Sequence, residues 1–295
     1  MARPLQVVVA CRLRDLPVLE MAVQRMGRMF PPHRLCVLAP DRDCAEIRGR
    51  LGGEARVIAE DGFIPGMTSA DLRAIPGRGP AFPKMAGWYF QQFLKLQFAF
   101  FEQEDDHYLI WDADTVPLRP MEFFNASGRM LLTTAEEFHA PYFSTYERIL
   151  GAEPNRAFSF IAQHMLVQKS VAREMLAAIG AHVPGEDTWA WKIVRSLPEG
   201  QELNLFSEYE TYGHYVKNRY PGRVECVRRP WTRGVLSPFG QALPSEKALE
   251  KLGKSYDYAA FERAYGGISG RIRAVLSRVW KTIVRPIYKR GTGRP

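Results

Sequence analysis

The sequence predicts an α/β fold in which a mostly parallel sheet is flanked by helices. Its first half alternates short apolar runs with segments of helical spacing, which is typical of a parallel sheet covered on both faces. The 295 residues are 46% hydrophobic and 24% charged, so the chain can bury a sizeable core. It lacks an apolar run of about 18 residues or more, and no transmembrane helix is therefore expected.

The first half reads as strand and helix in turn. Residues 6–11 are expected as a buried strand rather than a signal peptide, because the apolar core of this segment is short. Asp15 fits an N-cap, with Pro17 in the first turn, of a helix reaching about residue 26. The next expected elements are a strand over 33–39, a helix over 43–51, a strand over 55–59 and a long Gly- and Pro-rich loop over 61–83.

The second half begins with a strongly apolar helix over 84–103. A strand over 108–111 follows it and ends at two aspartates. The remaining expected elements are a strand over 130–133, a loop through 154, a strand over 158–168, a helix over 170–179 capped by Ser170, helices starting near Asp187 and Ser207, and a strand over 224–228.

The net positive charge of the chain comes from residues 268–295. The sequence has 40 Lys and Arg against 32 Asp and Glu, and residues 268–295 contain eight bases and no acid. Apolar residues recur there at steps of three and four, which predicts an amphipathic helix suited to an anionic membrane surface. The alternative is a helix packed on the body of the protein. Nucleic acid is a weaker interpretation, because no nucleic-acid-binding motif accompanies the charge.

The four cysteines, Cys11, Cys36, Cys44 and Cys226, match no zinc-binding spacing. Reduced, buried thiols in a cytoplasmic protein are the expected state. Together with the basic segment, this predicts a cytoplasmic protein, peripheral on the inner face of the cell membrane.

The pair Asp112 and Asp114 is the most informative motif. On a strand both carboxylates would lie on one side, about 7 Å apart at the backbone. Like charges so placed repel unless something positive lies between them. Mg²⁺ is typically held by one or two carboxylates while substrate phosphates and water complete its shell. The pair therefore predicts a metal–diphosphate site and a nucleotide-sugar enzyme; a solvated turn is the alternative.

The segment YLIWDADTVP (108–117) resembles the DxD strand of GT-A-fold glycosyltransferases. With GWYFQQFLKL (87–96), SFIAQHM (159–165) and SEYETYG (207–213), it is similar to a little-characterised bacterial family of glycosyltransferase-like proteins linked to surface polysaccharide synthesis. The likeness covers about residues 5–232. It implies a GT-A-like, Rossmann-related catalytic domain over 1–240, a connecting segment over 241–267 and the basic tail over 268–295.

The resemblance also implies roles for individual residues. Asp112 would contact the ribose or a metal-bound water, and Asp114 would bind Mn²⁺ or Mg²⁺ directly. The loop after the first strand would line the nucleotide pocket through Ala10, Cys11 and Arg12, with Asp15 near it.

Three carboxylates are candidates for the base that takes the acceptor's proton: Glu208, Glu210 and Asp187. Each stands at the start of an expected helix, where an acid also favours the helix dipole or caps the helix, so the alternative is structural. His214, four residues after Glu210, could complete the metal shell, although a solvent-facing histidine is expected there.

Further candidates could contact the diphosphate or the acceptor. Lys95 is one turn from Gln91 and could reach a diphosphate, or it could extend to water from the edge of an apolar helix. Gln163 and His164 could meet the acceptor or a phosphate, whereas a core histidine is the alternative for His164. Lys84 and Arg78 are further positive candidates.

The sequence thus predicts a metal-dependent glycosyltransferase that moves a sugar from a nucleoside diphosphate-sugar to a saccharide or lipid-linked acceptor. A nucleotidyltransferase or phosphohydrolase using the same carboxylates is one alternative, disfavoured because the chain has no Gly-rich phosphate loop. A non-catalytic protein that binds membrane or polysaccharide is the other.

Overall fold

The computed structural model describes residues 4–75, 82–101, 105–199, 204–233 and 243–261. Its central sheet has the strand order β3-β2-β1-β4-β7. The first four of these are parallel, and β7 runs antiparallel to β4. Their bounds are β1 Leu5–Ala10, β2 His33–Ala39, β3 Ala55–Ala59, β4 His107–Trp111 and β7 His164–Gln168. The predicted mostly parallel sheet is therefore confirmed.

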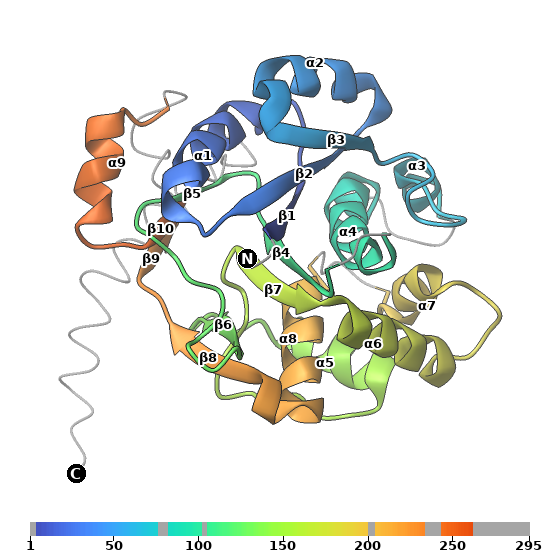
Figure 1. Ribbon diagram of the computed structural model, residues 1–295. Coiled ribbons are helices and arrows are strands. Elements are labelled where there is room, and N and C mark those ends of the chain that lie inside the picture. Colours follow the sequence, from blue (N-terminus) through green and yellow to red (C-terminus); the bar gives the residue numbers. More distant parts are fainter. Residues whose placement is uncertain (1–3, 76–81, 102–104, 200–203, 234–242, 262–295) are drawn as a thin grey trace, which may run out of the picture.

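Helices cover both faces of this sheet (Figure 1). The crossovers after β1 and β2 contain α1 (Leu16–Met29) and α2 (Asp41–Leu51), which lie on one face. The chain then returns past β1 to β4 through α4 (Phe82–Gln97), which lies on the other face and contacts β1. The valines of β1 are fully buried, as expected for a strand covered on both sides.

The second half adds helices and two small sheets around the carboxyl end of β4. One sheet joins β5 (Thr115–Pro117), β10 (Tyr258–Ala260) and β9 (Trp231–Arg233), and the other pairs β6 (Met130–Thr134) with β8 (Val224–Arg228). The remaining helices are α3 Ser69–Arg73, α5 Ala140–Leu150, α6 Lys169–His182, α7 Trp189–Ser196, α8 Glu208–Arg219 and α9 Glu246–Gly253.

The strands over 33–39, 55–59 and 224–228 are confirmed at both ends. Two expected loops are wrong because each contains a helix. In the first, Thr68 and Asp71 form a reciprocal capping box that starts α3. In the second, α5 ends at Gly151, whose φ of 64° is the left-handed conformation of a helix C-cap.

Other boundaries also differ from the expected ones. The apolar helix begins at Phe82 and ends at Gln97, where a 3₁₀ turn over Phe98–Phe100 follows it. The strand expected over 158–168 begins only at His164, because Gln163 has a φ of 64° and interrupts extended backbone. Ser170 does not cap α6, which starts one residue earlier; its hydroxyl donates instead to Asp106.

The predicted basic tail over 268–295 lies outside the described residues. Among the helices that are described, none combines the length and apolar character needed to cross a membrane.

Candidate functional site

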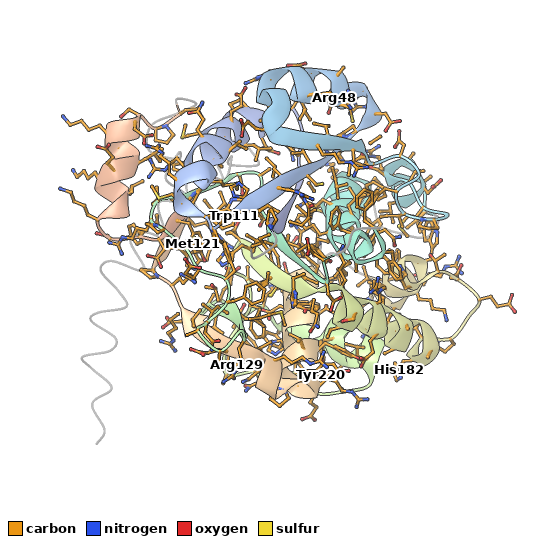
Figure 2. All side chains as sticks on the ribbon, viewed as in Figure 1. Arg48, Trp111, Met121, Arg129, His182 and Tyr220 are labelled. Carbon is orange, nitrogen blue, oxygen red and sulfur yellow. The ribbon has the colours of Figure 1, made fainter. Side chains whose placement is uncertain are left out.

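The two aspartates lie in a turn that directly follows β4. Trp111, the last residue of β4, is fully buried in the interior (Figure 2), and its indole N–H donates to the Thr115 carbonyl over 2.7 Å. The Thr115 N–H donates in turn to the Asp112 carbonyl over 3.0 Å. Asp112 and Asp114 therefore do not continue the strand as expected, but stand half-buried on a closed turn between β4 and β5.

Two other segments hold this turn through the backbone. The Asp112 N–H donates to the Gln163 carbonyl over 3.0 Å, and the Phe261 N–H donates to the Asp114 carbonyl over 2.7 Å. The start of β7 and the end of β10 thus fix the turn from two sides.

A buried lysine faces the first aspartate. Lys95 Nζ donates to Asp112 Oδ1 over 2.5 Å and to Glu208 Oε1 over 2.8 Å. The side chains of Lys95 and Glu208 are 3% and 4% exposed, and that of Asp112 is 20% exposed. The Tyr209 hydroxyl donates to the same Asp112 oxygen over 2.8 Å. One ammonium therefore lies between two carboxylates, and Asp112 is the side of this cluster that reaches solvent.

The titration of this cluster follows from its burial. Burial acts to lower the pKa of Lys95, but the Asp112 and Glu208 carboxylates outweigh it and raise this pKa, so the ammonium stays charged. Burial raises the pKa of Glu208, against the opposing effect of the Lys95 charge. Lys95 is thus neither extended to water nor placed to contact a diphosphate directly.

Helices α4 and α8 bring these residues together. The Gln92 side-chain oxygen, on α4, accepts from the Glu208 N–H over 3.1 Å at the first residue of α8. Ser207 caps α8 by accepting from the Glu210 N–H over 3.2 Å, and the helix starts where the sequence predicts. The Glu208 N–H has no partner within α8, as is usual in the first turn of a helix, and the Gln92 side chain of α4 supplies its hydrogen-bond acceptor.

Gln163 lies beside the turn in a conformation that is rare for residues other than glycine, with a φ of 64°. Its side chain is buried, and the amide orientation that satisfies its neighbours donates to Asp112 Oδ2 over 3.3 Å and accepts from Arg233 Nη2 over 2.7 Å. Arg233 Nη1 donates to Glu137 Oε2 over 2.8 Å. A continuous set of polar contacts thus runs from Asp112 to Glu137.

His164 is a core histidine, the alternative to its predicted substrate contact. Its Nε2 lies 3.0 Å from Thr133 Oγ1, and its ring stacks on Trp111 and meets the edge of Tyr258. Burial, reinforced by the charge of Arg229, lowers the pKa of His164 to about 3, so this imidazole is neutral at ordinary pH.

Glu210 binds a different part of the chain from Glu208. Its carboxylate accepts from Ser159 Oγ over 2.5 Å and from the Phe160 N–H over 3.0 Å. His214 Nε2 lies 3.1 Å from the same carboxylate, although not in hydrogen-bond geometry. The expectation of a solvent-facing His214 is wrong: it is fully buried, and the rings around it belong to Phe143, Tyr146, Phe158 and Phe160.

The loop after β1 lies at the same edge of the sheet as the acidic turn. Val8 of β1 pairs with Ile110 of β4, so Ala10 lies across from Asp112. Arg12 Nη1 contacts Glu60 Oε1 over 2.8 Å, at the end of β3. Glu60 was not among the predicted site residues; its only sequence signal is an acid directly after a strand.

The other residues named from this loop are placed as follows. Cys11 is buried, which raises the pKa of its thiol far above the usual range. Asp15 occupies the N-cap position of α1 without a side-chain cap bond and lies 3.3 Å from Arg14 Nε. Both belong to the edge at which the nucleotide pocket is predicted.

Asp187 pairs with a residue outside the Lys95 cluster, and the other candidates are exposed, half-buried or outside the described residues. Asp187 Oδ2 pairs with Arg195 Nη1 over 2.5 Å at the start of α7. Lys84 is exposed in the first turn of α4, and Gln91 is half-buried. Arg78 lies outside the described residues.

The acidic turn offers carboxylate ligands to a hard divalent cation. In the described parts of the chain no three His, Cys, Asp or Glu side chains gather around a common metal position. Asp112 and Asp114 nevertheless supply the one or two carboxylates with which Mg²⁺ is held when phosphates and water complete its shell. Lys95 and Tyr209 contact Asp112 Oδ1, and the Thr115 hydroxyl lies 3.4 Å from Asp114 Oδ1.

These features define an α/β protein with an acidic turn at the carboxyl edge of a mostly parallel sheet. Residues 5–234 match a family described as a family of unknown function (DUF6492), and the chain belongs to this family. No curated protein is significantly similar to it in sequence.

Solved structures with a similar course of the chain include glycosyltransferases. One is the galactosyltransferase LgtC in complex with donor and acceptor sugar analogs, with 12% identity, a TM-score of 0.46, and 99% of this chain and 98% of that chain covered. An active-site mutant of LgtC has 14% identity and a TM-score of 0.47 over 93% of this chain and 95% of that chain. Mouse xyloside xylosyltransferase 1 has 9% identity and a TM-score of 0.45 over 90% and 98%. Such distant similarities do not assign an activity.

Proposed function

We propose that the protein is a metal-dependent glycosyltransferase that transfers a sugar from a nucleoside diphosphate-sugar to a saccharide or lipid-linked acceptor, in surface polysaccharide or glycolipid synthesis. The observation that carries this proposal is the acidic turn at the end of β4, with Asp112 fixed by Lys95 and Tyr209. Ligands of open α/β sheets bind beyond the carboxyl ends of the strands, which is where this turn lies.

In this proposal Asp114 holds Mn²⁺ or Mg²⁺. The bound ion would act as a Lewis acid that neutralises the departing diphosphate. Lys95 holds one oxygen of the Asp112 carboxylate, and the Gln163 amide holds the second oxygen of the same carboxylate. The orientation of Asp112 is therefore set before any ligand arrives, which favours a ribose or metal-bound water at a single position.

The nucleotide lies on the β1 side of the turn in this proposal. Ala10, Cys11 and Arg12 end β1 and begin the loop that faces Asp112, with Asp15 at the next helix start. Arg12 is 26% exposed and is oriented by Glu60, so its guanidinium is available to a phosphate while it is held in place.

Of the three candidate bases, Glu208 has the strongest connection to the proposed site, because it shares Lys95 with Asp112. Glu210 and Asp187 are bound by Ser159 and Arg195 respectively. A base must come within hydrogen-bond reach of the acceptor hydroxyl. Glu208 is 4% exposed and paired with Lys95, so in this proposal it positions Asp112 rather than contacting the acceptor hydroxyl.

The site is tested by nucleotide binding and turnover in an Asp114→Asn variant. Nucleoside diphosphates and their sugars should raise the melting temperature of the wild type more with Mn²⁺ than without it, because a ligand of the folded state stabilises it. In D114N the extra rise in melting temperature that depends on Mn²⁺ should disappear, and kcat/KM should fall at least about 100-fold. The melting temperature of D114N without ligand should stay near the wild-type value.

Glu54→Gln is the matched control, since Glu54 is exposed and precedes β3, at the opposite edge of the sheet. Full transfer activity in D114N would refute the assignment of Asp114. Identifying the product separates the classes of enzyme: a transferase releases a nucleoside diphosphate, whereas a nucleotidyltransferase or phosphohydrolase releases pyrophosphate or phosphate.

We also propose that the basic residues of 268–295 bring the protein to an anionic membrane surface on the cytoplasmic side. The support is their charge, eight bases and no acid, each contributing about 1 kcal/mol near such a surface. The full chain should sediment with vesicles containing phosphatidylglycerol and not with phosphatidylcholine alone, and truncation after residue 267 should abolish this. Equal binding to both kinds of vesicle would contradict the proposal.

A further inference from the structure

Phe138 presents an aromatic face to solvent next to the acidic turn's polar contacts. Its side chain is 56% exposed. One face of the ring stacks on Phe143, with centroids 4.8 Å apart and 18° between the planes. Phe143 belongs to α5 and is fully buried. The ring of Phe138 is thus supported on one side by the core and exposed to solvent elsewhere.

Phe138 is tied to the acidic turn by its neighbour in the sequence. Glu137 accepts from Arg233 over 2.8 Å, Arg233 donates to Gln163 over 2.7 Å, and Gln163 donates to Asp112 over 3.3 Å. Glu137 and Arg233 are 41% and 32% exposed, so both remain accessible. The exposed ring of Phe138 and the carboxylate of the Glu137–Arg233 pair therefore come from adjacent residues, at the far end of contacts that begin at Asp112.

Tyr142, near the start of α5, is close enough to both Glu137 and Glu208 to feel their charges. Its ring meets the edge of His139 at a centroid distance of 4.4 Å. Burial raises the pKa of the Tyr142 hydroxyl, and the charges of Glu208 and Glu137 raise it further, which places the hydroxyl within the field of both carboxylates. Tyr142 therefore links the neighbourhood of Glu137 to that of Glu208.

The sheet order separates this region from the nucleotide side. β4 lies between β1 and β7, so Arg12 after β1 and Gln163 before β7 flank Asp112 from opposite sides. A donor held on the β1 side would expose its sugar toward the turn. The molecule that receives the sugar must then approach from the side of Gln163, Arg233 and Glu137.

The chemistry of this region suits a pyranose ring. One face of such a ring is a set of C–H groups that packs on an aromatic plane, while its hydroxyls need both hydrogen-bond donors and acceptors. Phe138 supplies the plane, and Glu137 and Arg233 supply an acceptor and donors in charge-assisted form. Arg233 is itself held over the Trp231 ring at 5.0 Å, which limits its motion.

We propose that Phe138, Glu137 and Arg233 form the subsite for the acceptor saccharide. The proposal rests on the transferase function proposed above. The ligand that packs on Phe138 is a neutral sugar unit, which belongs to a free or a lipid-linked saccharide.

The test compares Phe138→Ala with Phe100→Ala. Phe100 is 44% exposed and lies in the 3₁₀ turn after α4, so it is the matched loss of an exposed aromatic ring. The probes are methyl glucosides, methyl galactosides, lactose and maltose, with binding followed by saturation-transfer NMR and transfer followed by acceptor KM. F138A should weaken binding of the preferred probe about five- to tenfold and raise its KM similarly. F100A should leave both at wild-type values.

Glu137→Gln provides a second variant, because it keeps the shape of the side chain and removes its charge. It should also weaken the preferred probe, whereas thermal shift by the donor nucleotide should be unchanged in F138A and E137Q. If donors are consumed but F138A behaves like F100A, or if the wild type binds none of the probes, the subsite is refuted and the transferase function is not. If saccharides bind through Phe138 but no nucleotide sugar is bound or consumed, the transferase function fails and the saccharide site stands.

Discussion

Replacing Lys95 by methionine removes the only charge opposing two neighbouring carboxylates within the Lys95 cluster. The ammonium contacts Asp112 and Glu208 at 2.5 and 2.8 Å. In Lys95→Met, Asp112 keeps a solvent-facing side at 20% exposure, but Glu208 is left ionised with 4% exposure. Breaking a buried ion pair by removing one partner typically costs about 3–5 kcal/mol of stability.

The ordinary pKa of Glu208 sets a ceiling on this loss. A carboxylate stranded in the interior can take up a proton, and from an ordinary pKa of 4.5 this costs about 3.4 kcal/mol at pH 7 and about 0.7 kcal/mol at pH 5. K95M should therefore be destabilised by about 3 kcal/mol at pH 7 and about 1 kcal/mol at pH 5. The sign follows from the raised pKa of Glu208: the folded variant binds the proton more tightly than the unfolded chain, so its stability falls as pH rises above about 4.5.

Urea unfolding of wild type and variants at pH 7 and pH 5, followed by tryptophan fluorescence, measures these differences. The K95M/E208Q double variant should recover most of the loss at pH 7, because it leaves no stranded charge on α8. Lys192→Met is the control: Lys192 is also a buried lysine, but its ammonium donates to the Gly180 carbonyl. A loss in K95M that is the same at both pH values, or a double variant no more stable than K95M at pH 7, would show that Lys95 does not balance Glu208.

Two further predictions concern stability. The pKa of His164 is lowered to about 3, so the folded state resists the proton that the unfolded chain accepts near pH 6.5, and the free energy of unfolding should fall as the pH drops. Between pH 6 and pH 4 the free energy of unfolding of His164→Gln, measured by urea titration, should fall by about 2–3 kcal/mol less than that of the wild type. An equal loss in both proteins would contradict this. A side chain at Gly213 would overlap the Phe160 ring, so Gly213→Ala should cost about 1–3 kcal/mol, whereas Gly180→Ala, with nothing within 4 Å, should be neutral or slightly stabilising in thermal melts. A G213A protein as stable as wild type would refute the close packing.

The sequence predicted the central sheet well because its strands are buried on both faces and read as continuous apolar runs. The missed helix α5 shows the limit of such patterns. Its sequence, APYFSTYERIL, is rich in aromatic and β-branched residues that favour helix only weakly. The helix forms because Phe143 and Ile149 are fully buried against the rest of the fold, and this tertiary contribution is absent from local propensity.

The candidate site was predicted as separate residues and not as an arrangement. Asp112, Lys95 and Glu208 were each named from their own local patterns, but Lys95 and Glu208 are 113 positions apart and meet only because α4 packs on α8. Arg233 and Glu137 carried no signal, since both lie outside the expected helices and strands and single charges are ordinary on a protein surface. The contact of Arg233 with Gln163 depends on the left-handed backbone of Gln163, and a glutamine in the sequence does not predict that conformation.

The first turn of α8 shows most clearly what the fold adds to the sequence. Glu208 and Glu210 are two residues apart on a helix with about 3.6 residues per turn, so they face nearly opposite directions. Glu208 reaches Lys95 and through it Asp112, while Glu210 binds Ser159 and Phe160, in the segment that ends at Gln163. Because the Gln163 carbonyl accepts from the Asp112 N–H, both acids act on the same turn, one through side chains and the other through the backbone. The sequence offered two roles for these acids, a catalytic base or an interaction with the helix dipole. The structure indicates a third role, the positioning of Asp112 from two sides, which depends on the packing of α4, α8 and β7.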